Sequence, residues 1–350
     1  MRRAGLKKIS SAIVIAWLTA AAWTTPAIAD EVSPDLIRGE PLQSFNLHPV
    51  YMPFMQVLPM SPRLQTGGRM QLSVLGSYGN NFFLDPVDGG SSQVDADLDS
   101  EAFCTGILLT AGFGNRFEIN AMVYGSYHYG GFLDSVIEGY HGVFGFPNAG
   151  RELRDRGRTR FFLENSGGTV LDEDGSLGSA ALTVEPRYQL RKEAVWMGGV
   201  WDLAAGFPVK LPLTLGRHGL DGTGIDAGVR LFAGCALRRF NVAGAIGLMY
   251  LSMPEFAGDD HFSPVVVPFF FSAGWQAGRR LVLLSTVQGS TSPFSLDYDR
   301  TDRFTAVVNV GARIRCGSQG SVQLSFSEEF FTFAATDIGF NIGWSTYFGG

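Results

Sequence analysis

The stretch that decides the fold is residues 337–348, which read Asp-Ile-Gly-Phe-Asn-Ile-Gly-Trp-Ser-Thr-Tyr-Phe. From Ile338 to Phe348, every second position is mostly large and apolar, and the positions between are mostly small or polar. Successive side chains of a strand point to opposite faces, so this pattern predicts a strand with one aromatic, apolar face and one polar face. In a membrane barrel the apolar face meets lipid and the polar face meets the lumen.

The same alternation recurs along the chain from Arg69 onward. It is clearest at 223–237, where Ile225 and Val229 share one face and Arg230 shares the other with Asp226. The period of two predicts further strands of the same kind. The predicted strands, twelve in all, are 69–84, 95–112, 116–130, 177–190, 195–211, 223–237, 239–253, 264–278, 280–292, 302–315, 320–330 and 337–348.

The connections between these strands alternate in length. Tight joints fall at 114–115, 191–194, 238, 279 and 316–319. Longer connections lie between them, at 85–94, 131–176, 212–222, 254–263, 293–301 and 331–336. Short turns on one side and longer loops on the other are typical of outer-membrane barrels. We therefore predict an all-β fold, a transmembrane antiparallel β-barrel of about 12 strands in the outer membrane.

Two segments precede the predicted barrel. A basic start, an apolar run that ends at Trp23 and the small residues 27–29 predict a signal peptide over 1–29. Residues 30–66 lack alternation and are rich in proline, so they are predicted to be irregular. They would form either a periplasmic tail or a plug in the lumen. The barrel is predicted to occupy 67–350.

The composition suits a membrane barrel and argues against other classes. The chain has 45 Gly and 28 Phe in 350 residues, and only 17% of its residues are charged, below the usual quarter. A net charge of -6 argues against a nucleic-acid partner. Cys104, Cys235 and Cys316 are scattered, so neither a zinc site nor a disulfide framework is predicted.

The longest loop is predicted to carry a short amphipathic helix at 132–145. Apolar residues recur there at helical spacing, from Phe132 to Phe144. Such a helix beside the barrel mouth would either cap the lumen or lie in the membrane interface. Residues 158–173 would add a small hairpin above the membrane.

Charged and amide side chains fall on the faces that are predicted to point into the lumen. The candidate lumen-lining residues are Glu118, Glu185, Arg187, Asp202, Lys210, Asp226, Arg230, Asn309 and Arg313. An isolated charge is costly in a narrow, low-dielectric lumen, so opposite charges are expected to pair across strands. Two interpretations stay open: a structural network that fills the barrel, or a polar constriction that filters small solutes.

An acidic pattern at the outer rim has a possible metal-binding interpretation. Asp95, Asp97, Asp99 and Glu101 share one face of an extended strand, where their oxygens could bind Ca²⁺. The alternative is a solvated acidic rim, because Ser100 stands where a calcium loop needs glycine. No other cofactor is expected.

A third idea is a hydrolase at the rim, built around His261 and Ser263. The sequence shows neither an orienting third group nor an oxyanion-binding device beside them. No catalytic residue is therefore assigned, and the protein is not predicted to be an enzyme.

Four stretches resemble a known family. They are PLQSFNLHPVYMPF at 41–54, VIEGYHGVFGFPNAGRE at 136–152, GFPVKLPL with GLDGTGIDAGVRL over 206–231, and FSEEFFTFAATDIGFNIG at 326–343. Together they resemble the uncharacterised bacterial outer-membrane barrel family called domain of unknown function 3187, over residues 40–348. The resemblance implies a Gram-negative outer-membrane barrel and brings no established activity.

The same resemblance implies two partners, the lipid of the outer membrane and the barrel-assembly machinery. Such barrels usually finish on an aromatic residue that this machinery reads. Here Phe348 is followed by Gly349 and Gly350.

Taken together, the patterns favour a narrow passive channel or transporter for small molecules, apolar ones among them, since transport is the common role of such barrels. A plugged structural or cell-surface barrel without transport is the alternative, and a rim hydrolase ranks third. A solute partner is expected only under the first interpretation.

Overall fold

The structure, a computed structural model, describes residues 40–85, 96–145, 150–151, 154–165, 168–213, 224–254, 261–295, 302, 304–329 and 335–349. The chain divides into two compact units, Met1–Ser33 and Pro34–Gly350, and every described residue belongs to the second. The signal peptide predicted over 1–29 lies outside the described residues.

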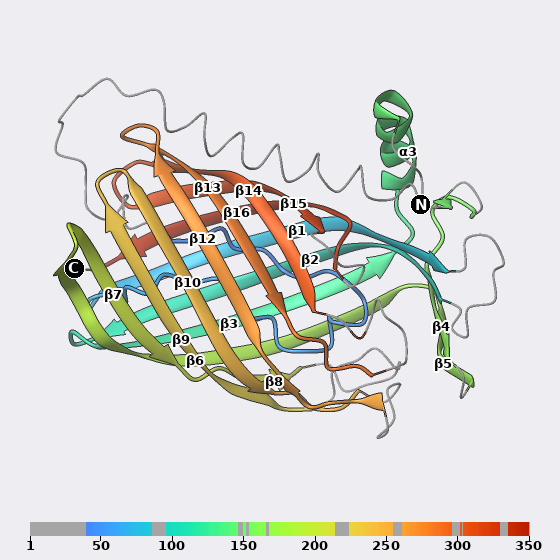
Figure 1. Ribbon diagram of the computed structural model, residues 1–350, viewed down its shortest axis with the longest axis horizontal. Helices are drawn as coiled ribbons and strands as arrows, with labels where there is room; N and C mark the ends of the chain where they lie inside the picture. Colours follow the sequence, from blue (N-terminus) through green and yellow to red (C-terminus); the bar gives the residue numbers. More distant parts are fainter. Residues whose placement is uncertain are drawn as a thin grey trace. The chain divides into compact units, whose positions relative to one another are not determined.

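The second unit contains a closed antiparallel barrel (Figure 1). Its neighbouring strands follow the order β1-β16-β15-β14-β13-β12-β10-β9-β7-β6-β3-β2. The ring closes because Met70 at the start of β1 lies opposite Phe348 of β16 on one side and Ala111 of β2 on the other. The strands of the wall are β1 (Met70–Asp85), β2 (Ala96–Phe113), β3 (Phe117–Tyr129), β6 (Leu177–Trp196), β7 (Gly199–Gly206), β8 (Val209–Pro212), β9 (Asp226–Leu237), β10 (Phe240–Tyr250), β11 (Val265–Val266), β12 (Pro268–Gln276), β13 (Leu281–Ser290), β14 (Thr305–Cys316), β15 (Gly320–Glu329) and β16 (Ile338–Phe348).

All of the predicted strands are confirmed, and two of them are interrupted. The predicted strand 195–211 is split into β7 and β8, and 264–278 into β11 and β12. Pro208 and Pro268 stand at these interruptions, where a proline cannot donate a ladder hydrogen bond. The register continues across both, because β8 pairs with β9 and β11 pairs with β10.

The predicted joint at 191–194 is wrong. Strand β6 continues to Trp196, and the turn to β7 is made by Met197 and Gly198, both with positive φ. The polar residues from Arg191 to Ala194 lie instead at irregularities of the β6–β7 register. A strand bulge inserts unpaired residues and so imitates the composition of a turn.

The two faces of the wall follow the predicted alternation. In β16, Phe340 and Ile342 are 51% and 57% exposed, whereas Asn341 between them is buried. The same holds in β9, where Val229 faces outward and Arg230 faces inward. A wall that is apolar outside and polar inside is the arrangement that a bilayer requires of a barrel. Here the outward face is the lipid-facing face.

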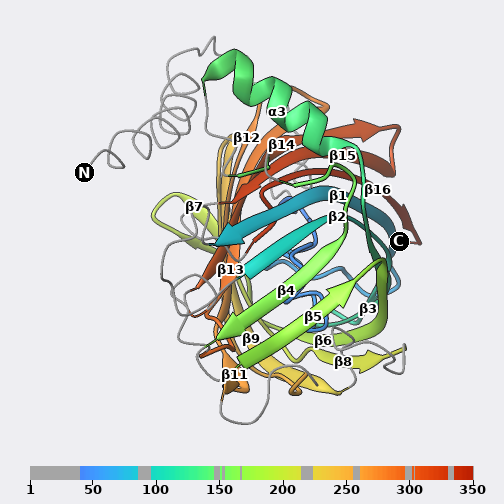
Figure 2. The ribbon, with the colours of Figure 1, turned by 90° about the vertical axis from the view of Figure 1, so that its right-hand side faces the viewer.

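The two ends of the barrel differ. Short turns such as Gly114–Arg116 and Gly317–Gln319 connect the strands at one end, called here the turn end. The longer connections lie at the other end, called here the loop end. It carries α3 (Leu133–Phe144) and the hairpin of β4 (Arg160–Asn165) and β5 (Gly168–Asp174), in which β4 pairs with the first residues of β2 (Figure 2). The predicted helix and hairpin are thus present. In the described part of the chain, no helix is long and apolar enough to cross a bilayer.

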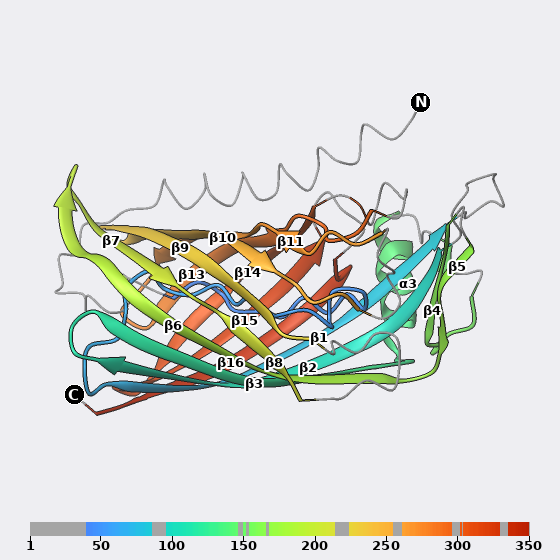
Figure 3. The same ribbon diagram turned by 90° about the horizontal axis from the view of Figure 1, so that it is seen from below.

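Residues 40–65 lie inside the barrel and, with the exposed residues 66–68 that lead to β1, are called here the plug segment (Figure 3). None of them belongs to a strand. Leu42, Leu47 and Val50 are at most 1% exposed, and they pack against inward-facing residues of the wall. The lumen is therefore filled by chain that precedes the first strand.

Candidate functional site

The plug segment enters the lumen at the turn end. There Arg313, near the end of β14, donates hydrogen bonds to the carbonyl oxygens of Glu40 and Pro41, at 2.6 and 3.1 Å. Further into the lumen, the side chain of Gln323 bonds to both the amide and the carbonyl group of Gln43. These contacts satisfy backbone groups that no strand partner satisfies.

The plug segment reaches the loop end before it turns back. The amide of Leu47 donates to Oγ1 of Thr336, in the connection between β15 and β16, at 3.0 Å. The turn begins at His48, whose carbonyl oxygen accepts the amides of Tyr51 and Met52. The rings of Tyr51 and Phe54 then pack on Phe294 with centroid separations of 5.9 Å. The turn is thus held by aromatic contacts at the mouth of the barrel.

After its turn the plug segment runs back towards the turn end, and this part is called here the returning leg. Basic side chains of β6, β8 and β9 hold it. The Nζ atom of Lys210 donates to the carbonyl oxygen of Pro53 at 2.6 Å, and Arg230 donates to that of Leu58 at 2.9 Å. Arg187 donates to the carbonyl oxygen of Ser61. A ladder of cationic donors therefore follows the leg from the loop end towards the turn end.

Each of these basic side chains also forms a buried ion pair with an acidic residue of another strand. Lys210 lies 3.0 Å from Asp226, Arg230 lies 3.2 Å from Glu185, and Arg187 lies 3.0 Å from Glu118. Burying an ion pair is costly unless further hydrogen bonds satisfy the remaining groups. The carbonyl oxygens of the plug segment supply acceptors for those bonds.

Two of the acidic partners bind the plug segment as well. Asp226 accepts the amide of Met55 at 2.8 Å, and Glu118 accepts the amide of Gln65 at 2.7 Å. In two of these pairs the cation thus binds a carbonyl oxygen of the plug segment and the anion binds an amide group. The wall and the plug segment satisfy each other, so removing either leaves buried charge without partners.

Phe232 separates two like charges in this network. The guanidinium groups of Arg187 and Arg230 lie 4.3 and 4.5 Å from the centre of its ring, which is fully buried. An aromatic face attracts cations through its quadrupole. Phe232 therefore stabilises both arginines at a place where they would otherwise repel each other.

The structure places all nine sequence-predicted lumen residues on the inner side of the wall. They are Glu118, Glu185, Arg187, Asp202, Lys210, Asp226, Arg230, Asn309 and Arg313, and none is more than 8% exposed. Seven of them make the contacts described above. The other two bond within the wall, since Asp202 accepts the amide of Glu193 and Asn309 accepts from Ser327 and Asn341.

Sequence reasoning missed Tyr124 as a contact of the plug segment. Its hydroxyl accepts the amide of Gln56 at 3.3 Å and donates to the carbonyl oxygen of Phe54 at 3.4 Å. The available signal was its parity, because Tyr124 shares the inward face of β3 with Glu118 and Asn120.

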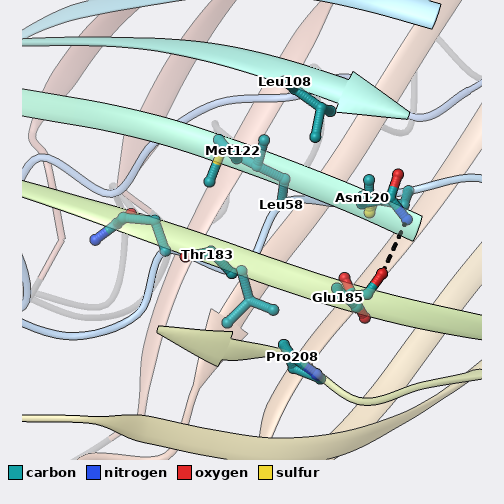
Figure 4. Close-up of a pocket in the computed structure, with 10 residues that line it drawn as sticks. Leu58, Leu108, Asn120, Met122, Thr183, Glu185 and Pro208 are labelled. Carbon is teal, nitrogen blue, oxygen red and sulfur yellow. Dashed lines mark hydrogen bonds between the residues drawn. The ribbon is translucent and has the colours of Figure 1, made fainter. Parts of the chain in front are cut away.

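Two cavities remain beside the returning leg. One of about 20 Å³ lies between the leg and β2, β3 and β6, with Leu58, Met122 and Glu185 in its lining (Figure 4). The second, of about 100 Å³, lies nearer the loop end. Its lining is mainly apolar and includes Phe54 and Val57 of the plug segment with Met249, Val266 and Phe270 of the wall.

The acidic residues of the outer rim are engaged by protein groups. Asp97 accepts from Arg154 and Arg158, at 3.1 and 3.2 Å, and Glu101 accepts from the amide of Leu133. Among the residues that the structure describes, no cluster of three or more His, Cys, Asp or Glu could hold a metal. Asp95 lies outside the described residues, so the Ca²⁺ interpretation stays a prediction.

Asp99 of the same rim is buried, with 3% of its surface exposed. It lies beyond Phe103, the first lipid-facing aromatic residue of β2, and opposite Arg160 of the outer hairpin. Burial, followed by the neighbouring carboxylate of Asp134, raises its pKa to about 7.

Two residues considered for a rim hydrolase, His261 and Ser263, contact backbone groups of the next connection. The ring of His261 bonds to the carbonyl oxygen of Ser295 at 3.0 Å, and the amide of Ser263 donates to the carbonyl oxygen of Pro293. These contacts fasten one connection to the next at the loop end.

Solved structures with a similar fold are outer-membrane barrels. The COG4313 outer membrane channel from Pseudomonas putida F1 matches with 12% identity and a TM-score of 0.54, over 83% of this chain and 100% of that chain. The NanC porin matches with 9% identity and a TM-score of 0.43, over 79% and 98%. Outer membrane phospholipase A from Escherichia coli matches with 7% identity and a TM-score of 0.38, over 80% and 92%.

The first of these likenesses supports the fold, and the lipid-facing wall agrees with it, so the chain is an outer-membrane β-barrel. No curated protein matches the sequence. A family model described as "Protein of unknown function (DUF3187)" matches residues 86–348. The chain belongs to this family.

Proposed function

We propose that the protein is a narrow outer-membrane channel for small, largely apolar molecules, which the plug segment closes in its resting state. The observation that carries this proposal is how the plug segment is held. Side chains of the wall bind it, through bonds such as Arg230 to Leu58 and Gln323 to Gln43, and no strand pairing joins it to the sheet. Such contacts can be exchanged for water without opening the barrel wall.

The apolar character of the solute follows from the larger cavity. Its lining joins aromatic residues of the plug segment to aliphatic and aromatic residues of the wall, and these outnumber the polar residues, such as Arg230, Gln288 and Thr305. Small-molecule sites are typically apolar hollows with a few polar groups that fix orientation. An uncharged molecule of a few heavy atoms fits this chemistry better than a sugar or an ion.

A permanently sealed structural barrel is the second candidate. The three buried ion pairs support it, because each is satisfied only while the plug segment stays in place. The two candidates differ in whether the plug segment ever leaves.

Planar-bilayer recordings of wild type, Arg230→Gln and Asn309→Ser test the proposal. Arg230→Gln removes a contact to the plug segment, whereas Asn309 bonds to Ser327 and Asn341 of the wall. We expect rare openings in wild type, frequent openings in Arg230→Gln and wild-type behaviour in Asn309→Ser. A folded Arg230→Gln barrel that never opens would favour the sealed barrel.

Uptake measurements test the solute class separately. Cells that produce Arg230→Gln should take up an uncharged aromatic dye faster than cells that produce wild type. A disaccharide should show a much smaller increase. Equal increases for both would contradict the proposed apolar solute, but they would still support closure of the channel by the plug segment.

A further inference from the structure

Helix α3 presents an uncovered apolar stripe. Phe132, Val136, Tyr140 and Val143 are 64%, 56%, 50% and 79% exposed. Steps of three and four residues place them on one face, because an α-helix turns once in 3.6 residues. Single exposed apolar residues are common, but three on one face of a twelve-residue helix, continued by Phe132 at its N-cap, form a surface.

The face of α3 beside the stripe is fixed to the barrel, so the direction of the stripe is defined. Leu133 and Ile137 are buried. Arg151 bonds to Asp134 of the helix at 2.8 Å and to Asp337 before β16 at 2.7 Å. The helix cannot rotate to hide its stripe without breaking these contacts.

The stripe continues the lipid-facing wall. The ring of Phe132 stacks on that of Tyr78, with centroids 6.1 Å apart and planes at 22°. Tyr78 lies on the outward face of β1 and contacts the hydroxyl of Tyr129 on β3. Phe103 and Tyr127 on the same side of the wall are 44% and 51% exposed. Aromatic residues in this position form the girdle of a barrel at the membrane interface.

The helix runs across the direction of the strands at the loop end (Figures 1 and 2). Because the strands span the membrane, a helix that crosses the mouth of the barrel in this way lies along the membrane surface. This is the orientation of interfacial amphipathic helices, whose apolar face enters the boundary between head groups and acyl chains by about 5–10 Å.

We propose that α3 is an interfacial anchor whose stripe is buried in the outer leaflet of the membrane. The occupant of the stripe is lipid, because the stripe joins the lipid-facing aromatic girdle through the contact of Phe132 with Tyr78. A second protein copy fits less well, since a stable interface needs about 800 Å² from each partner, more than four side chains supply.

Tryptophan fluorescence in vesicles that contain acyl-brominated phosphatidylcholine tests the anchor in the full-length barrel. Val143→Trp and Val136→Trp place the probe in the stripe. Gly142→Trp is the matched control, because a side chain there meets no atom within 4 Å and points about 100° away from Val143. Wild-type fluorescence is subtracted in each case.

We expect bromolipid to quench most of the fluorescence added by Val143→Trp and Val136→Trp, and little of that added by Gly142→Trp. The quenching should persist as the protein is diluted in lipid. Unquenched fluorescence at both stripe positions would overturn the proposal. So would quenching that disappears on dilution, which would indicate a second copy as the occupant.

Discussion

The carboxylate of Glu185 and the guanidinium of Arg230 lie 3.2 Å apart although their strands, β6 and β9, are not neighbours at that level. Gly206 of β7 lies between them. A Cβ at Gly206 would collide with Oε1 of Glu185. The missing side chain leaves the passage through which the pair forms.

Arg230→Ala should lower the free energy of unfolding by about 3–5 kcal/mol, because it leaves the buried carboxylate of Glu185 without its partner. Urea unfolding followed by the gel shift of the folded barrel measures this loss. The double variant Glu185→Gln, Arg230→Gln removes both charges and should cost less. A small loss in Arg230→Ala would indicate that water reaches Glu185 and that the lumen is open.

Gly206→Ala should lower the free energy of unfolding by about 1–3 kcal/mol, since the added methyl group pushes Glu185 away from Arg230. Gly278→Ala is the control, because a Cβ there meets no atom within 4 Å. Thermal unfolding compares the two. If both variants unfold at the same temperature, Glu185 has another position in which it reaches Arg230.

Val229→Arg should destabilise the barrel by about 2–4 kcal/mol, because it places a charge on the lipid-facing side within β9. Leu237→Arg lies on the same face at the turn end and should cost only about 0–1 kcal/mol. Unfolding in lipid vesicles measures both. A reversed order would mean that the membrane crosses the barrel at another height.

Asp99→Asn should remove part of the pH dependence of stability. The pKa of Asp99 is raised to about 7, so folding favours its protonated form. Its stabilising contribution is complete below the unfolded pKa, near 4, and is lost as the pH rises through 7. Wild type should therefore lose more melting temperature between pH 5 and pH 8 than Asp99→Asn.

Asp97→Asn is the control for this pH series. It loses two contacts to arginine and should melt lower at both pH values. If Asp99→Asn keeps the wild-type slope between pH 5 and pH 8, another group causes that slope.

The sequence predicted the side of the wall on which each charge lies, and the physical reason is simple. Lipid on one side and polar groups on the other impose a period of two, which a residue such as Arg230 between Val229 and Leu231 displays directly. The helix of the outer loop was equally visible, because Phe132, Val136 and Tyr140 repeat at helical spacing.

The partners of those charges could not be predicted. Lys210 and Arg187 bind carbonyl oxygens of Pro53 and Ser61. Every residue has a carbonyl group, so the residue types do not indicate which ones are bound. The path of the plug segment depends on contacts between residues far apart in the chain, such as Leu47 with Thr336. The irregularity near Glu193 was mistaken for a turn for a related reason, since a bulge and a turn use the same residues.

Both ends of the plug segment lie at the turn end, where Glu40 meets Arg313 and the amide of Gly68 donates to the carbonyl oxygen of Gly112. The segment is therefore a loop that enters the barrel and leaves it through the same opening. It does not leave the barrel at the loop end. It can therefore be withdrawn, or inserted after the wall has closed, without separating any pair of strands. Short turns face the periplasm in outer-membrane barrels, so a pull on the segment from that side would retract it, whereas a push would seat it more firmly.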